Sequence, residues 1–253
     1  LLKDFDVEFR GALEHFLGFK VMRDRANGKL KLTQTASLIK LLTESGMMKT
    51  EKKMTAAPPD CKPSVKDDPD PTTPEGKAEL AEVSKLPYAN RVGSFLWIAR
   101  TYRPDISWPV GMMTRWMAKP NKKMWQMSSY LLKFLSSTKN RGIIYSRSDS
   151  PLTLTGVCDA NHLHDYGDAK ENRKNTLGWA FFFGGASVSV RSRKAQRPSG
   201  SSAESETQGL WDATREAIWL RRLCRELGLE QLEPTIIDCD SQVAIRLTEQ
   251  DCL

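Results

Sequence analysis

The stretch Leu152-Thr153-Leu154-Thr155-Gly156-Val157-Cys158-Asp159 determines how the second half of the chain is interpreted. Apolar and polar residues alternate at its start, which is typical of a strand with one buried face. We therefore expect Asp159 at the end of a strand. Two further strand-like runs follow at residues 177–183 and 186–191, joined by Gly184-Gly185, a dipeptide that suits the positive φ of a tight hairpin turn. The three runs predict an antiparallel meander.

A long helix is expected after the meander. Ser201-Ser202-Ala203-Glu204 has the form of a capping box, and Gly228 suits the end of the helix. Residues 234–239 then form a short apolar run that ends in Asp240, and residues 241–247 resemble the start of another helix. A strand–helix–strand crossover would make this run parallel to the first strand. Residues at steps of three and four define the helix face that should pack on the sheet: Glu206, Leu210, Ala213, Ala217, Leu220 and Cys224.

Three carboxylates, Asp159, Glu206 and Asp240, should converge at one edge of this sheet. Like charges at short range raise each other's pKa, so such a group is costly unless cations neutralise it. Two magnesium ions about 4 Å apart would do so, with manganese as a possible substitute, and would clamp the attacking water and the leaving oxygen of a phosphodiester. Taken singly, each Asp reads as a turn residue or helix cap and Glu206 as a solvated helix residue. The combination, in this order, favours a metal site.

Three short elements carry a family resemblance. Cys158-Asp159-Ala160-Asn161, the run from Ser201 to Glu206, and Cys239-Asp240-Ser241-Gln242 resemble Cys-Asp-Ala-Asp, Ser-Ser-Thr-Glu-Ala-Glu and Cys-Asp-Asn/Ser in the ribonuclease H domain of copia-type (Ty1/copia) LTR retrotransposon Pol polyproteins. Arg173-Lys174-Asn175-Thr176-Leu177-Gly178-Trp179 is similar to the family's Arg-Lys-Ser-Thr-Ser-Gly-Tyr, and residues 216–223 match the family closely.

The resemblance implies a ribonuclease H-like mixed sheet with helices and an RNA:DNA hybrid endoribonuclease, in which Asp159, Glu206 and Asp240 are the catalytic, metal-binding carboxylates. Asn161 stands where the family has a second Asp that is not a core ligand. The family's fourth carboxylate would follow the next strand and helix, beyond Leu253, so we expect the nuclease module to be incomplete as given. By the same resemblance, the protein would be cytoplasmic and packaged in a virus-like particle.

The first half resembles the end of the family's reverse transcriptase. Asn27-Gly28 predicts a hairpin between residues 18–24 and 29–34, and residues 35–45 a helix that ends at Gly46. The motifs around His15 and Leu41 are similar to the stretch that follows the polymerase palm in this family. The polymerase motif Tyr-Val-Asp-Asp is absent from the sequence, so polymerisation is not predicted. The chain is thus expected to be the end of a reverse transcriptase plus a ribonuclease H domain.

Composition divides the middle of the chain in two. Residues 56–87 hold seven prolines among acidic residues, which predicts a solvated linker that loops out. Residues 91–147 hold eleven Lys or Arg against one acidic residue, Asp105, with interleaved aromatic residues, and we expect helices at 91–100, 106–117 and 124–137. In the family this region is the thumb and connection. The functional interpretation is a basic platform for a hybrid duplex, and the alternative is an ordinary helical core with a solvated charged face.

Eight cations are candidates for contact with nucleic acid. Four belong to the expected loop 191–197, which would lie beside the carboxylates, and four to the basic region. An ordinary exposed loop is the alternative for the first set. His162 and His164 follow Asp159, but magnesium prefers oxygen ligands, so we interpret them as surface residues. The candidates are Arg191, Arg193, Lys194 and Arg197 in the loop, and Arg103, Arg115, Lys122 and Lys123 in the basic region.

Overall composition agrees with a nucleic-acid partner. The 253 residues carry a formal charge of +7, which favours a polyanion, here an RNA:DNA hybrid, with the rest of the reverse transcriptase as protein partner. Five cysteines without a Cys-x-x-Cys pair argue for a reduced, intracellular protein without structural zinc, and no apolar run is long enough for a membrane helix. Cys158 and Cys239 are interpreted as small buried fillers.

We therefore expect an α+β chain in four parts: a reverse transcriptase remnant (1–54), an acidic linker (55–87), a basic helical connection (88–150) and a ribonuclease H-like domain (151–253). Two alternatives to an active hybrid nuclease remain. One is a catalytically inactive nucleic-acid-binding remnant that keeps the basic platform. The other, an integrase-like nuclease, fits less well because its third carboxylate has a different spacing.

Overall fold

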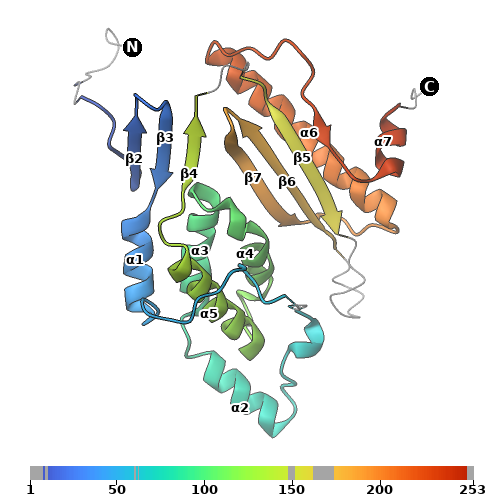
Figure 1. Ribbon diagram of the computed structural model, residues 1–253. Coiled ribbons are helices and arrows are strands. Elements are labelled where there is room, and N and C mark those ends of the chain that lie inside the picture. Colours follow the sequence, from blue (N-terminus) through green and yellow to red (C-terminus); the bar gives the residue numbers. More distant parts are fainter. Residues whose placement is uncertain are drawn as a thin grey trace.

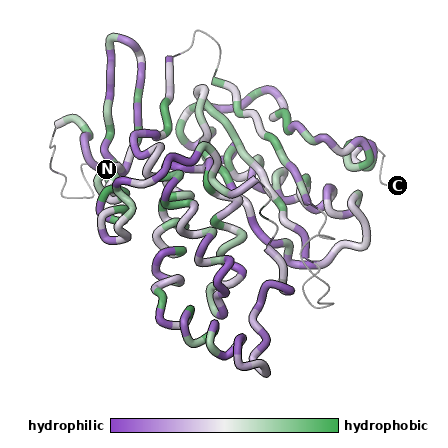
Figure 2. Tube along the Cα trace, turned by 60° about the horizontal axis from the view of Figure 1, so that its bottom comes forward, coloured by the Kyte–Doolittle hydropathy of each residue, from purple (hydrophilic) through white to green (hydrophobic). Residues whose placement is uncertain are grey.

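The computed structural model describes residue 8 and residues 11–59, 61, 63–147, 152–161 and 174–249. Its described part is an α+β chain with two four-stranded sheets, and a group of helices lies beside the N-terminal sheet and below the C-terminal one in Figure 1. Figure 2 shows hydrophobic and hydrophilic residues alternating along the helices, as expected where one face of a helix is buried. No helix in the described ranges combines the length and the hydrophobicity needed to cross a membrane.

The N-terminal sheet has the strand order β1-β2-β3-β4, with every neighbouring pair antiparallel. The predicted hairpin is confirmed: at its turn Gly28 has a φ of +59° and the Asn27 backbone N–H donates to Asp24 Oδ1 over 3.0 Å. The fourth strand was not predicted, because it lies more than a hundred residues further along the chain. The strands are β1 (His15–Phe16), β2 (Phe19–Asp24), β3 (Lys29–Thr33) and β4 (Ile143–Ser146).

The helices α1 (Thr35–Glu44), α3 (Tyr88–Thr101), α4 (Ser107–Met113) and α5 (Lys122–Ser137) share one apolar core. The predicted helices are confirmed, except that the one expected at residues 106–117 is broken into η2 (Pro104–Ile106), α4 and η3 (Thr114–Trp116). Because α1 packs on α5 and β4 pairs with β3, residues 11–54 and 88–147 form one packed unit, called here the helical unit. Its fully buried side chains include Leu38, Leu42, Val92, Phe95, Met124, Leu131 and Leu135.

The expectation of a looped-out linker is wrong. The stretch contains η1 (Val65–Asp67) and α2 (Pro74–Val83), and it packs against the helical unit. Pro74 takes the first helical position, where a missing N–H costs nothing, and Thr73 Oγ1 accepts from Gly76 N over 3.0 Å. Asp68 Oδ1 accepts from the indole of Trp116 and the amide of Asn121, each over 2.8 Å. Asp68 thus binds buried donors instead of water.

The C-terminal sheet has the order β7-β6-β5-β8. Strands β5, β6 and β7 pair as the predicted antiparallel meander, and β6 and β7 are joined at Gly184 and Gly185, with φ of +60° and +77°. The last strand is parallel to β5, as predicted, with Gly156 opposite Ile237 and Val157 opposite Asp238. The strands are β5 (Thr155–Asn161), β6 (Thr176–Phe183), β7 (Ala186–Lys194) and β8 (Ile237–Asp238).

Helix α6 (Ser202–Glu226) covers one face of this sheet, and α7 (Gln242–Glu249) follows β8 (Figure 1). Small residues on α6 allow it to approach the strands closely: a Cβ placed at Gly209 would lie 3.2 Å from that of Ala160. The capping box is confirmed, with Ser201 Oγ accepting from Glu204 N over 3.1 Å. The core between α6 and the sheet is built from Leu154, Cys158, Trp179, Phe181, Ala213, Ala217 and Leu220.

Two strand boundaries differ from the prediction. β5 begins at Thr155 and continues through Asp159, so this residue lies within the strand rather than at its end. β7 runs on to Lys194, so most of the expected basic loop is strand. In both cases the partner strand β6 extends the pairing, with Asp159 opposite Gly178 and Lys194 opposite Thr176.

The helical unit contacts the C-terminal sheet along β7 and at the start of β6. α4 packs on β7, and the Tyr145 hydroxyl donates to the carbonyl of Ser187 in β7 over 3.2 Å. Arg115 Nη2 of η3 donates to Oγ1 of Thr176 in β6 over 2.7 Å. In Figure 1 β4 lies between β3 and β7. The edge at β8 lies on the other side of the sheet, away from the helical unit.

Candidate metal centre and nucleic-acid surface

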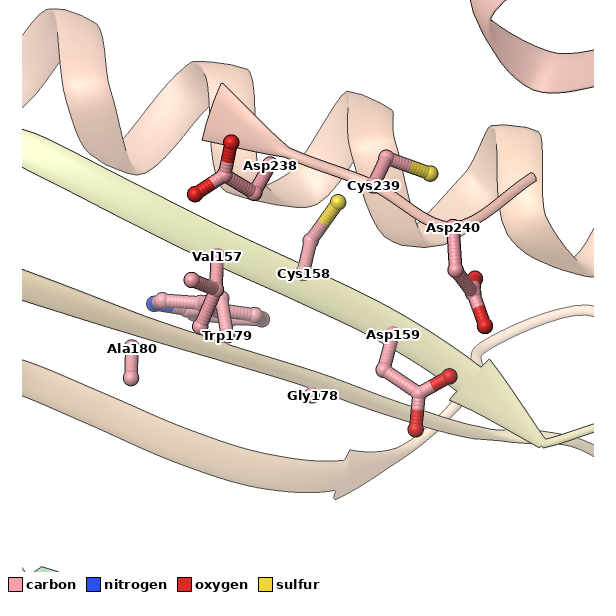
Figure 3. A pocket seen from close by; sticks show the side chains of 9 residues that line it. All are labelled: Val157, Cys158, Asp159, Gly178, Trp179, Ala180, Asp238, Cys239 and Asp240. Atoms are coloured by element: carbon pink, nitrogen blue, oxygen red, sulfur yellow. The ribbon is translucent and has the colours of Figure 1, made fainter. Parts of the chain in front are cut away.

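The three candidate carboxylates come from three different elements. Asp159 is exposed on the face of β5 opposite α6, Glu206 is half-buried in the first turns of α6, and Asp240 is exposed between β8 and α7. Asp159 and Asp240 line the same open pocket. Figure 3 shows their two carboxylates near each other, close to the end of β5. The histidines His162 and His164 lie outside the described residues.

Glu206 has the most perturbed carboxyl group of the three. Burial raises its pKa to about 7, and the charges of Asp159 and then Asp240 add to the shift, while a backbone hydrogen bond from Ala160 opposes it. Its buried Oε2 has no hydrogen-bond partner among the described residues. A half-buried carboxylate beside two like charges is stabilised by a cation.

The closest group of potential ligands differs from the expected one. One ligand atom each from Glu206, Cys239 and Asp240 lie within 4.8 Å of one another. Asp159 is outside this group, although it acts electrostatically on Glu206. The structure therefore brings Glu206 and Asp240 together, as expected, and adds Cys239, which the sequence did not mark as a candidate ligand. Cys239 packs against the core under α6, in keeping with its interpretation as a small filler, but it is only half-buried and its sulfur also lies near the two carboxylates.

The side chain of Cys158 lies beside that of Cys239 and points to the opposite face of the sheet from Asp159. It belongs to the core under α6, and its thiol contacts that of Cys239. Burial raises the pKa of Cys158 to about 12, with Cys239, Glu206 and Asp159 adding to the effect. β5 thus presents a thiol to one face and a carboxylate to the other within two consecutive residues.

Four candidate cations lie on or near β7. Arg193 shares the α6 face of the sheet and forms an ion pair with Asp212 of that helix. Lys194 lies on the opposite face, and burial, followed by the charges of Arg115 and Lys174, lowers its pKa. Arg197 is exposed in the loop after β7. A pocket between α3, α4 and β7 is lined by Arg100, Arg115, Arg191, Arg193 and Lys194 together with Glu216; we call it the basic groove.

Arg103 is not a nucleic-acid contact, and that prediction is wrong. The side chain is 1% exposed, its Nε and Nη2 donate to the Asp105 carboxylate over 2.8 and 2.7 Å, and Nη1 donates to the Thr138 carbonyl over 3.1 Å. The guanidinium holds the end of α3 to the end of α5. Lys123 forms an ion pair with Asp67 over 2.8 Å, whereas Lys122 is exposed at the start of α5.

Several known proteins similar to this chain are polyproteins of transposons. It is 33% identical over 249 residues to the retrovirus-related Pol polyprotein from transposon TNT 1-94 of Nicotiana tabacum, which is 98% of this chain and 18% of that protein. It is 29% identical over 245 residues to the corresponding polyprotein from transposon RE1 of Arabidopsis thaliana, 95% of this chain and 15% of that protein. The chain belongs to the copia-type retrotransposon Pol polyproteins.

This Pol chain spans less than a fifth of those two relatives. A third relative, the secreted RxLR effector protein 161 of Plasmopara viticola, is 33% identical over 138 residues, 54% of this chain and 94% of that protein. No family model and no solved structure matches the Pol chain. The likeness thus extends over nearly the whole chain. It includes the helical unit as well as the edge of the C-terminal sheet that carries Asp159, Glu206 and Asp240, called here the carboxylate edge.

Proposed function

We propose that this Pol chain hydrolyses the RNA strand of RNA:DNA hybrids, with magnesium or manganese held by Asp159, Glu206 and Asp240 in a ribonuclease H-like sheet. The observation that carries the proposal is the state of Glu206. Its Oε2 is buried without a hydrogen-bond partner among the described residues, next to Asp240 and within the field of Asp159. Carboxylate oxygens are the ligands that magnesium prefers, so these residues fit such an ion.

Each carboxylate is held by a different constraint. Pairing with Gly178 fixes the backbone of Asp159, the capped start of α6 fixes Glu206, and Asp240 precedes Ser241, whose Oγ accepts from Ala244 N over 3.2 Å. Bound metal would activate water and stabilise the leaving 3′ oxygen of the cut strand. The three side chains would orient that ion, and its positive charge would offset the repulsion between their carboxylates.

The basic groove supports a duplex as the substrate. Burial, and then the charges of Arg115 and Lys174, lower the pKa of Lys194, so positive charge is concentrated beside β7. Phosphates neutralise such charge without reading sequence, and hybrid shape and 2′-hydroxyls would supply the discrimination. The remainder of the reverse transcriptase would be the protein partner.

One observation favours a second candidate, a Pol segment that binds hybrid without cutting it. Asp159 lies outside the group formed by Glu206, Cys239 and Asp240. A site that replaces one carboxylate by a thiol is less suited to magnesium, because magnesium is a hard cation. The basic groove would then be the functional surface.

Cleavage of a labelled RNA:DNA hybrid with magnesium tests the two candidates. The chain, and a form extended at its C-terminus, are compared with the Asp240→Asn variant of each, and Asp238→Asn serves as a control in the same pocket. We expect the RNA strand to be cut, the Asp240→Asn variant to lose cutting, and the control to retain it. Hybrid binding by every form without any cutting would overturn the nuclease and leave the binding segment.

A further inference from the structure

A sulfur atom stands among the oxygen ligands at the edge of the C-terminal sheet. The thiol of Cys239 and carboxylate oxygens of Glu206 and Asp240 lie within 4.8 Å of one another, and the thiol of Cys158 contacts that of Cys239. We propose that Cys239, Glu206 and Asp240 form a binding site for a single zinc-like divalent cation, with Cys158 beside its thiol ligand. The site is distinct in ligand chemistry from the three-carboxylate magnesium site but overlaps it.

The ligand set matches zinc better than magnesium. Thiolates favour borderline and soft cations such as zinc, whereas magnesium takes oxygen ligands and near-ideal octahedral geometry. Structural and catalytic zinc sites are mostly tetrahedral, with Zn–S of about 2.3 Å and Zn–O of about 2.0–2.2 Å. Ligand atoms around such an ion are therefore somewhat closer to one another than 4.8 Å, so the three side chains would draw together when the ion binds.

The backbone holds the two cysteines in neighbouring positions. Gly156 pairs with Ile237 and Val157 with Asp238 in the parallel ladder, so Cys158 and Cys239 are the next residues of the same two segments. Figure 3 shows the two side chains rising from β5 and from the segment that follows β8, while Asp159 points away from them. The fold thus brings the thiol of Cys239 to two carboxylates, with Cys158 behind it, and Asp159 remains outside the group.

An overlapping zinc site has a consequence for the nuclease. Glu206 and Asp240 belong to both ligand sets, so zinc would displace magnesium and inhibit cleavage. This consequence rests on the proposed function, but the binding of zinc does not, and cobalt(II) reports on it directly because a cobalt–thiolate bond gives a charge-transfer absorption that oxygen ligands do not give.

The test is a titration of the reduced protein with cobalt(II), followed by displacement with zinc. We expect one equivalent of cobalt to produce the thiolate charge-transfer absorption and zinc to abolish it. Cys239→Ser should remove the absorption and weaken zinc binding by more than about tenfold, the range found for residues that support a metal site. Cys61→Ser is the matched control, since this half-buried cysteine packs on Met127 in the helical unit. Circular dichroism checks that each variant is folded.

The outcomes separate the zinc site from the nuclease. A folded Cys239→Ser variant that keeps the cobalt absorption, or a wild-type protein that binds cobalt without it, would overturn the zinc proposal even if hybrid is cut. Cobalt absorption that depends on Cys239 in a protein that never cuts hybrid would support the zinc site and count against the nuclease alone. Where cleavage is seen, the zinc concentration that halves each variant's own rate should rise more than about tenfold for Cys239→Ser and stay unchanged for Cys61→Ser.

Discussion

The helical unit and the carboxylate edge of the C-terminal sheet hold their charged side chains differently. In the helical unit the buried guanidinium of Arg103 has carboxylate and carbonyl partners, and Asp68 of the acidic stretch accepts two hydrogen bonds from this unit. At the carboxylate edge, Glu206 is half-buried beside two like charges, with one oxygen lacking a partner among the described residues. The first pattern stabilises a fold, and the second is the one expected where an ion or substrate completes the structure.

Packing follows the same division. Leu38 of α1, Phe95 of α3 and Leu131 of α5 are fully buried in one core. α6 covers its sheet with a narrow face of small residues, and it leaves Trp211, Ile218 and Trp219 exposed. We infer that the helical unit contributes most of the stability and that the carboxylate edge carries the chemistry.

The largest expected effect tests that inference on stability. Phe95→Ala should lower the free energy of unfolding by about 3–5 kcal/mol, because it removes a fully buried ring and leaves a cavity. Ile218→Ala on α6, where the side chain is 47% exposed, should change it by no more than about 0.5 kcal/mol. Urea unfolding followed by circular dichroism measures both. Equal losses would mean that the two regions do not differ as described.

The next effect concerns Arg103. Arg103→Met should lower the free energy of unfolding by about 2 kcal/mol. The loss is smaller than the loss expected when a fully buried ion pair is broken, because the partner Asp105 is 38% exposed and can be hydrated. Hybrid affinity at a temperature where the variant is folded should not change. Lys119→Met, at an exposed position, is the control for stability. A specific loss of hybrid affinity in Arg103→Met would restore this residue as a nucleic-acid contact.

A third prediction follows from the raised pKa of Glu206. Between the ordinary pKa of about 4.5 and about 7 the folded protein retains a proton that the unfolded chain has lost, so stability falls as pH rises through this range. Without metal, Glu206→Gln should therefore be more stable than wild type by about 1 kcal/mol at pH 8, a figure reduced for screening by water, and equal to it near pH 4. Thermal unfolding at the two pH values measures this. A variant less stable than wild type at pH 8 would contradict the account.

The smallest effect distinguishes two cations of β7. Lys194→Gln should reduce the salt dependence of hybrid binding by about one unit of the logarithmic slope, as expected for one lost phosphate contact. Arg193→Gln should reduce it less, because Asp212 already pairs with Arg193. Affinities measured over a series of salt concentrations give both slopes. The reverse order would show that the ion pair opens when nucleic acid binds.

Local patterns in the sequence predicted much of the carboxylate edge. The Gly184-Gly185 turn and the N-cap at Ser201 depend on residues close together in the chain, and both are confirmed. The inward face of α6 is confirmed from Ala213 to Cys224, whereas in its first turns Ser205 and Gly209 are buried and Glu206 is half-buried. A strand–helix–strand order also predicted the parallel pairing of β5 with β8, which brings Asp240 toward Glu206.

Contacts between residues far apart in the chain could not be predicted from local sequence patterns. The pairing of β4 with β3, the packing of the acidic stretch on the helical unit and the burial of Arg103 all join residues from distant positions, and composition alone suggested solvent exposure for the last two. Cys239 was not recognised as a potential ligand for another reason. A cysteine at the end of a predicted strand is usually a small core residue, and only the approach of Glu206 on α6 makes its sulfur a potential ligand.

Binding of manganese to the folded, magnesium-free protein tests the central claim most directly, because it does not depend on turnover. Isothermal titration of wild type, Glu206→Gln, Asp240→Asn and the pocket control Asp238→Asn compares the carboxylates one at a time. We expect wild type and the control to bind with equal affinity and the other two variants to bind more than about tenfold more weakly. Equal binding by all four proteins would contradict a metal centre at this edge of the sheet.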